Sequence, residues 1–95
     1  MNFISIAGKV SEISPKTTSA SGIALMKFVV SVDKHNKGEL DQFEVTVFRD
    51  LADTKLEVGQ FVGITGKLSS NNYDKDDKKY YNCSIVGSNI SLLGK

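Results

Sequence analysis

The chain has 95 residues, which is enough for one domain and too few for a second core. Its hydrophobic content of 40% is ordinary for a folded globular protein, and no apolar run approaches the roughly 18 residues of a membrane span. The formal net charge of +1 predicts no strong long-range attraction to nucleic acid, so any basic surface has to be assembled locally.

The N-terminus and the cysteine content indicate in which cellular compartment the protein is expected. Residues 1–6 contain neither a basic segment nor a long apolar one, so we expect no signal peptide, no membrane association and a cytoplasmic protein. The single cysteine, Cys83, excludes an intrachain disulfide and is typical of a reducing compartment.

Hydrophobic alternation predicts two strands in the first third of the chain. The first covers residues 3–10 and extends through residue 13. Residues 14–22 are rich in turn formers and hold the single proline, so we expect a loop there. The second strand covers about residues 23–32, and a charged loop with a glycine follows at 33–41.

The third strand, residues 42–49, contains an aromatic residue on an unexpected face. Phe43, Val45 and Val47 share the face that we expect in the core, whereas Phe48 lies on the opposite, polar face. An aromatic ring displayed among polar and basic residues is typical of a platform for stacking nucleic-acid bases. The alternative for Phe48 is packing under the next element or in an oligomer interface.

A short helix is expected from Leu51 to about Lys55. The carboxylate of Asp50 can accept hydrogen bonds from the free amides of its first turn. Asp53, three residues further on, resembles the back-reaching member of a capping box.

The fourth strand is predicted over residues 61–69, with Val62, Ile64 and Leu68 facing inward. A polar hairpin tip follows at residues 71–79. The turn formers and charges in this tip predict that it lies outside the core.

The fifth strand is predicted over residues 80–86, with Cys83 as a small buried residue on its inward face. Residues 90–93 form a short closing segment. Residues 1–95 are therefore expected to form a single all-β domain, a five-stranded barrel with a short helix between strands 3 and 4. Closure of such a barrel removes exposed sheet edges.

Five segments of the chain have the same order and spacing as the strands of one protein family. They are residues 4–10, 22–32, 43–52, 58–68 and 73–85. They include a glycine–basic–aliphatic step in the first strand and an aromatic-led third strand that ends in an aromatic, a basic residue and Leu-Ala. In these segments the chain resembles the OB-fold domain of bacterial and phage single-stranded DNA-binding proteins, over nearly its whole length.

The resemblance implies binding of single strands by aromatic stacking in a basic groove, usually by an oligomer. Carried over by position, Phe48 and Tyr73 fall on stacking aromatics, and Arg49 and Lys67 fall on basic positions. The chain departs from the family at Gln42, where many members have an aromatic, and it contains no tryptophan. It also ends without the acidic tail that cellular members use to recruit replication enzymes, which suggests a phage, plasmid or accessory version, or a chain from which the tail has been removed.

Single-strand binding requires flat apolar faces for bases and cations for phosphates. Phe43 is expected in the core. For Phe61, the sequence leaves two roles open: lining the binding groove or lying in an oligomer interface. The predicted binding residues for single-stranded DNA are Phe48, Tyr73, Tyr80, Lys9, Lys27, Lys34, Arg49, Lys67, Lys78 and Lys79.

The outer face of the first strand suggests self-association. This face carries the small side chains of Ser5 and Ala7 and one large apolar side chain, that of Phe3. Two copies can pair their strand edges or pack this face, so we expect a homodimer or a homotetramer.

Signals for metals and catalysis are weak. Residues 74–77 lack the glycine and glutamate of a calcium-binding loop, and His35 stands alone in a polar loop. No glycine-rich phosphate motif precedes a helix. We therefore expect no metal, no cofactor and no enzymatic activity.

The predicted function is sequence-independent binding that protects single-stranded DNA in replication, recombination or repair, in the host cytoplasm if the protein is phage-encoded. Replication or recombination proteins are possible further partners. The alternative is an OB-fold protein-interaction module of a replisome or primosome with weak nucleic-acid binding, which the near-neutral charge favours. RNA binding, as in cold-shock-type barrels, is a third option.

Overall fold

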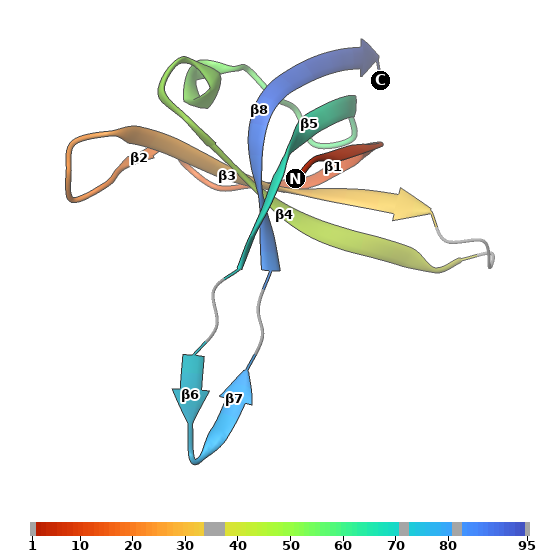
Figure 1. Cartoon of the computed structure of the whole chain (residues 1–95). Coiled ribbons are helices and arrows are strands. Elements are labelled where there is room, and N and C mark those ends of the chain that lie inside the picture. The colour runs from red at the N-terminus through yellow and green to blue at the C-terminus, as the bar shows by residue number, and fades with distance from the viewer. Residues whose placement is uncertain (1, 34–37, 71–72, 81–82, 95) are drawn as a thin grey trace.

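A computed structural model describes residues 2–33, 38–70, 73–80 and 83–94, with the backbone alone for Tyr73 and Tyr80. Figure 1 shows a strongly twisted β-barrel with one hairpin projecting from it. The elements are β1 (Ile4–Ile13), β2 (Thr17–Thr18), β3 (Ala24–Asp33), β4 (Leu40–Phe48), the 3-10 turn η1 (Arg49–Asp53), β5 (Phe61–Ser70), β6 (Tyr73–Lys75), β7 (Lys78–Tyr80) and β8 (Cys83–Gly94).

Five of these strands close into a barrel. The sheet order is β1-β5-β8-β4-β3, and β1 also pairs with β3, so the sheet returns to its first strand. All pairings are antiparallel except that of β4 with β8. This closed five-stranded arrangement is the OB-fold topology, and it confirms the barrel that the alternation predicts.

The barrel interior is filled by side chains from every wall strand and from η1. Strand alternation puts one face of each strand inward, and β-branched residues suit that pleated surface. Phe28 of β3 is the largest of the fully buried side chains in the described chain, and Ala52 of η1 is buried in the same cluster. The buried core consists of Val10, Met26, Phe28, Val30, Val45, Val47, Ala52, Val62, Ile64 and Ile85.

The prediction of a helix from Leu51 to about Lys55, with Asp50 as its cap, is wrong in the type of helix, in its position and in its capping residue. The chain forms a 3-10 turn over Arg49–Asp53, and the N-cap is Phe48, which makes no side-chain capping bond. Arg49 has a positive φ of 58°, so the chain reverses immediately after β4 and the turn begins before Asp50. The carboxylate of Asp53 forms an ion pair with Lys16 in the loop before β2, which ties η1 to that loop.

Two residues that were expected to face the core are exposed. Leu68 is exposed because β5 pairs with β1 only as far as Gly66, and beyond that point β5 leaves the barrel wall. Cys83 is exposed for the same reason, since β8 first pairs with β4 at Ile85. Residues 90–93 are not a separate segment, because they continue β8 along β5 past a bulge opposite Thr65 and Gly66.

The hairpin of β6 and β7 extends the β5–β8 arm away from the barrel (Figure 1). Tyr73 pairs with Tyr80 along its backbone, and Asp76 and Asp77 form the turn with positive φ angles. Both central residues of a tight hairpin turn need such angles when the turn matches the strand twist. Among the described residues, no helix is long and apolar enough to cross a membrane.

Candidate nucleic-acid interface

A continuous band crosses the outer face of four neighbouring barrel strands. Lys27 of β3 pairs with Thr46 of β4, Thr46 pairs with Val86 of β8, and Val86 pairs with Lys67 of β5. Directly paired residues display their side chains on the same face of a sheet. We call this surface the outer band, and it comprises Leu25, Lys27, Thr46, Phe48, Lys67 and Val86.

Phe48 provides the aromatic face of the outer band. Its side chain is 36% exposed, and it pairs with Leu25 across β3 and β4. Lys27 lies two residues from Leu25 on the same face, so a cation sits diagonally across from the ring. An exposed ring beside a lysine is the combination that base stacking and phosphate contact require.

The floor of the outer band is uncharged. Thr46 is only 8% exposed, and it lies between its register partners Lys27 on β3 and Val86 on β8. Val86, its partner on β8, is half-buried. Lys27 and Lys67 flank this floor, and Glu44 is the acidic residue next to it on the outer face of β4. The charge of the outer band itself is therefore positive.

The other predicted cations do not all join the outer band. Arg49 is exposed at the start of η1, directly after Phe48. Lys78 and Lys79 are exposed on β7 in the projecting hairpin, where Lys79 pairs with Asp74 in the backbone register. Lys34 lies outside the described residues, as do the side chains of Tyr73 and Tyr80.

Lys9 lies on a different part of the barrel, with Phe61. The Lys9 Nζ is 5.2 Å from the centroid of the Phe61 ring, a cation–π distance. Phe61 is 44% exposed, and β1 and β5 pair at these two residues. Sequence reasoning left the role of Phe61 open, and the partner that explains its position is visible only in the register of β1 and β5.

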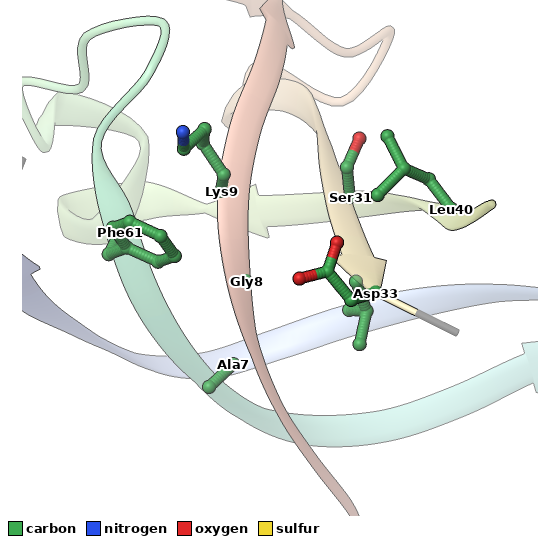
Figure 2. A pocket seen from close by; sticks show the side chains of 8 residues that line it. Ala7, Gly8, Lys9, Ser31, Asp33, Leu40 and Phe61 are labelled. Carbon is green, nitrogen blue, oxygen red and sulfur yellow. The ribbon is translucent and has the colours of Figure 1, made fainter. Parts of the chain in front are cut away.

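A hollow of about 400 Å³ lies beside this pair. Figure 2 shows Lys9 and Phe61 on one side of β1, and Ser31, Asp33 and Leu40 on the other. The Asp33 carboxylate lowers the attraction of this hollow for phosphate. The hollow therefore suits a phosphate-bearing strand less well than the outer band does.

Gln42 makes a polar contact where the resemblance expects an aromatic residue. Its Nε2 donates to the Ser31 Oγ at 3.4 Å, and the Ser31 Oγ donates to the Ser11 Oγ at 3.1 Å. This chain of hydrogen bonds satisfies the Ser31 hydroxyl, which is only 9% exposed. At this position the barrel surface carries a hydrogen-bond network instead of a stacking ring.

The proposed self-association face is exposed on β1. Ser5 and Ala7 are exposed, and Phe3 precedes the first residue of β1. Within the described ranges, residues 4–8 pair with β5 alone, because pairing with β3 begins at Lys9. One edge of this half of β1 is thus available for another strand. In the described part of the chain, no group of three or more metal-ligating side chains comes together.

The closed five-stranded barrel places the protein among the OB-fold proteins. The family model for the single-strand binding protein family matches residues 1–93. The chain therefore belongs to the single-strand binding protein family.

Curated relatives agree with this membership. The chain is 24% identical to the single-stranded DNA-binding protein of Aquifex aeolicus, over all of this chain and 71% of that protein. It is also 24% identical to single-stranded DNA-binding protein 1 of Staphylococcus aureus, over 98% of this chain and 61% of that protein. The chain thus spans only part of the length of these relatives.

Solved structures show the same fold. The mitochondrial single-stranded DNA binding protein Rim1 of S. cerevisiae superposes with a TM-score of 0.78 at 23% identity, covering 97% of this chain and 94% of that chain. A second crystal structure of Rim1 has a TM-score of 0.80 at 22% identity with the same coverage.

Proposed function

We propose that the protein binds single-stranded DNA without sequence preference, with the outer band as its binding surface. The observation that carries this proposal is the placement of Phe48 and Lys27 diagonally across from each other on the outer face of β3 and β4. Stacking on an aromatic ring is sequence-tolerant because every base has a flat π-face. Membership of the single-strand binding protein family supports the same function.

The biological role that follows is protection of exposed strands in replication, recombination or repair. A coated strand does not re-anneal and is shielded from nucleases. We propose that this role is non-catalytic and requires no cofactor, and that the protein acts in the cytoplasm. The curated relatives, which are named for single-stranded DNA binding, support the role.

Titration with oligothymidine at low and high salt tests the proposed function. Binding that grows with oligonucleotide length and weakens with salt is the expected result, because phosphate contacts release counterions. Absence of binding below about millimolar concentration would support a protein-interaction module of a replisome or primosome instead. A parallel titration with oligouridine decides between DNA and RNA.

Replacing Phe48 by alanine should weaken oligothymidine binding by about 1–3 kcal/mol, because a stacking platform is lost. Fluorescence anisotropy with a labelled oligothymidine measures the change. Leu92→Ala is the matched control, since Leu92 is an exposed apolar residue of β8 away from the outer band. A folded Phe48→Ala protein with unchanged affinity would show that the ring is not a platform.

The main effect of Lys67→Ala should be a weaker salt dependence of oligothymidine binding. Removing one phosphate contact lowers the slope of log K against log salt by about 0.7 for a single strand. Lys55→Ala is the control, because Lys55 is exposed in the connector after η1. Equal slopes for the wild type and Lys67→Ala would remove Lys67 from the phosphate path.

We also propose a homodimer or homotetramer that forms through β1. The edge of residues 4–8, which the described residues leave unpaired, and the exposed side chains of Phe3, Ser5 and Ala7 support this proposal. Solution mass by light scattering measures the state. A monomer at micromolar concentration would contradict it.

A further inference from the structure

The aromatic end of the outer band continues onto β2. Thr17 pairs with Leu25, and Leu25 pairs with Phe48, so these three side chains form one row on the outer face of β2, β3 and β4. Thr17 is exposed, and so is Lys16, which directly precedes it. A single strand that stacks a base on Phe48 and leaves the sheet over β2 therefore reaches Lys16 next.

An ion pair joins Lys16 to the turn that begins beside Phe48. The Lys16 Nζ donates to the Asp53 Oδ1. η1 starts at Arg49, the residue after Phe48, and ends at Asp53, and it lies on the same side of the barrel as β2 (Figure 1). A 3-10 turn rises about 2 Å per residue, so η1 places the Asp53 backbone within roughly 10 Å of the end of β4.

Contacts other than this ion pair hold the backbones of both partners. The Ser14 N–H donates to the Lys27 carbonyl at 2.9 Å, and β2 pairs with β3, so the chain is held on both sides of Lys16. η1 is anchored separately by the buried Ala52. The side chains of Lys16 and Asp53 are 49% and 61% exposed, and ion pairs at such exposure add little to stability.

A phosphate of a bound strand can replace the carboxylate in this ion pair. The lysine ammonium is a donor only, and it binds carboxylate and phosphate oxygens in the same way. Contact with a strand also releases counterions from the phosphates, whereas an ion pair within the protein does not. In the unbound protein, Asp53 thus occupies a cation that suits the phosphate path.

We propose that Lys16 is a phosphate-binding residue of the single-strand site and that Asp53 competes with the phosphate for it. When a strand binds, a phosphate oxygen takes the place of the Asp53 carboxylate on the Lys16 ammonium. This inference rests on the proposed function and extends its surface from the outer band to the loop before β2. Asp53 then lowers the affinity for single strands, because its ion pair with Lys16 has to be broken.

Asp53→Asn should bind oligothymidine more tightly than the wild type. The gain should be about 1.5- to 5-fold at low salt, the equivalent of one exposed ion pair that no longer has to be broken. Fluorescence anisotropy with a labelled oligothymidine measures it. Asp50→Asn is the matched control, because it removes the same charge from the same turn and Asp50 forms no ion pair with a described residue.

A double-mutant cycle shows whether the gain acts through Lys16. The gain of Asp53→Asn should disappear in Lys16→Ala/Asp53→Asn, since the cation that it frees is missing. Any gain of Asp50→Asn should persist in Lys16→Ala/Asp50→Asn.

The salt dependence of binding provides a second readout. Lys16→Ala should lower the slope of log K against log salt by about 0.7, the value for one phosphate contact with a single strand. Lys55→Ala, which removes an exposed lysine from the connector after η1, should leave the slope unchanged. Urea denaturation of each variant should give a stability close to that of the wild type.

Four outcomes would overturn the inference. Unchanged or weaker binding by folded Asp53→Asn, while Phe48→Ala weakens binding, removes the competition and leaves the proposed function intact. A gain that persists without Lys16 shows that the Asp53 charge acts on the strand directly. A marked loss of stability in Asp53→Asn assigns the ion pair to folding instead. Failure of the wild type to bind oligothymidine overturns the proposed function and this inference with it.

Discussion

Gly66→Ala should destabilise the barrel by about 3 kcal/mol or more, at the upper end of what overpacking costs. A Cβ built on Gly66 would lie 2.1 Å from the carbonyl oxygen of Val86, which is backbone and has no flexible end to move. This contact occurs at the bulge where β5 and β8 shift register, so β8 cannot recede without losing its pairing with β5. Chemical denaturation with urea measures the loss.

Gly63→Ala is the matched control on the same strand. A Cβ at Gly63 meets the Leu93 Cδ1 at 3.7 Å, an ordinary van der Waals contact with a flexible side chain. We expect a stability within about 1 kcal/mol of the wild type. Only the folded protein binds oligothymidine. Gly66→Ala should therefore also lower the amount of bound oligothymidine in proportion to the fraction that is unfolded, whereas Gly63→Ala should not. Equal stability of the two variants would show that β8 adapts at the bulge.

Phe28→Ala should cost about 3–5 kcal/mol of stability, the range for truncating a buried aromatic residue. Phe28 is 1% exposed and lies in β3 between its partners on β1 and β4. Small domains have a total stability of about 5–15 kcal/mol, so this variant should be close to unfolded. Thermal denaturation followed by circular dichroism should show a fall in Tm of about 12–40 °C.

Phe48→Ala makes the same chemical change on the other face of the same sheet, and it is the control for Phe28→Ala. Because Phe48 is already partly exposed, its truncation should leave a much smaller loss of stability and should act on oligothymidine binding instead. If Phe48→Ala destabilises the protein as much as Phe28→Ala does, the ring is a packing residue and the outer band loses its aromatic platform.

The faces of the strands could be predicted from the sequence wherever both sides of a strand are paired in the barrel. Alternation with a period of two placed Val62 and Ile64 in the core correctly. The same alternation failed at Leu68 and Cys83, because it identifies which residues share a face and not where the wall of the barrel ends. The end of the wall depends on the lengths of neighbouring strands.

The candidate site was predictable in part. The position of Phe48 on a polar face is a local property of β4, and it pointed to the outer surface before any neighbour was known. Its proximity to Leu25 and Lys27 depends on the register of β3 and β4, which local patterns do not encode. The same limit explains why Lys9 was grouped with Phe48, although its neighbour is Phe61.

The order of strands, turn-rich loops and apolar faces in the chain specified a small closed β-barrel of the single-strand binding protein family, because each of these is set by residues close together in sequence. The composition of the outer band and the replacement of the expected helix by a 3-10 turn depended on the folded arrangement. These features arise from pairing between strands far apart in the chain, and a shift of one residue in that pairing would turn each side chain to the opposite face.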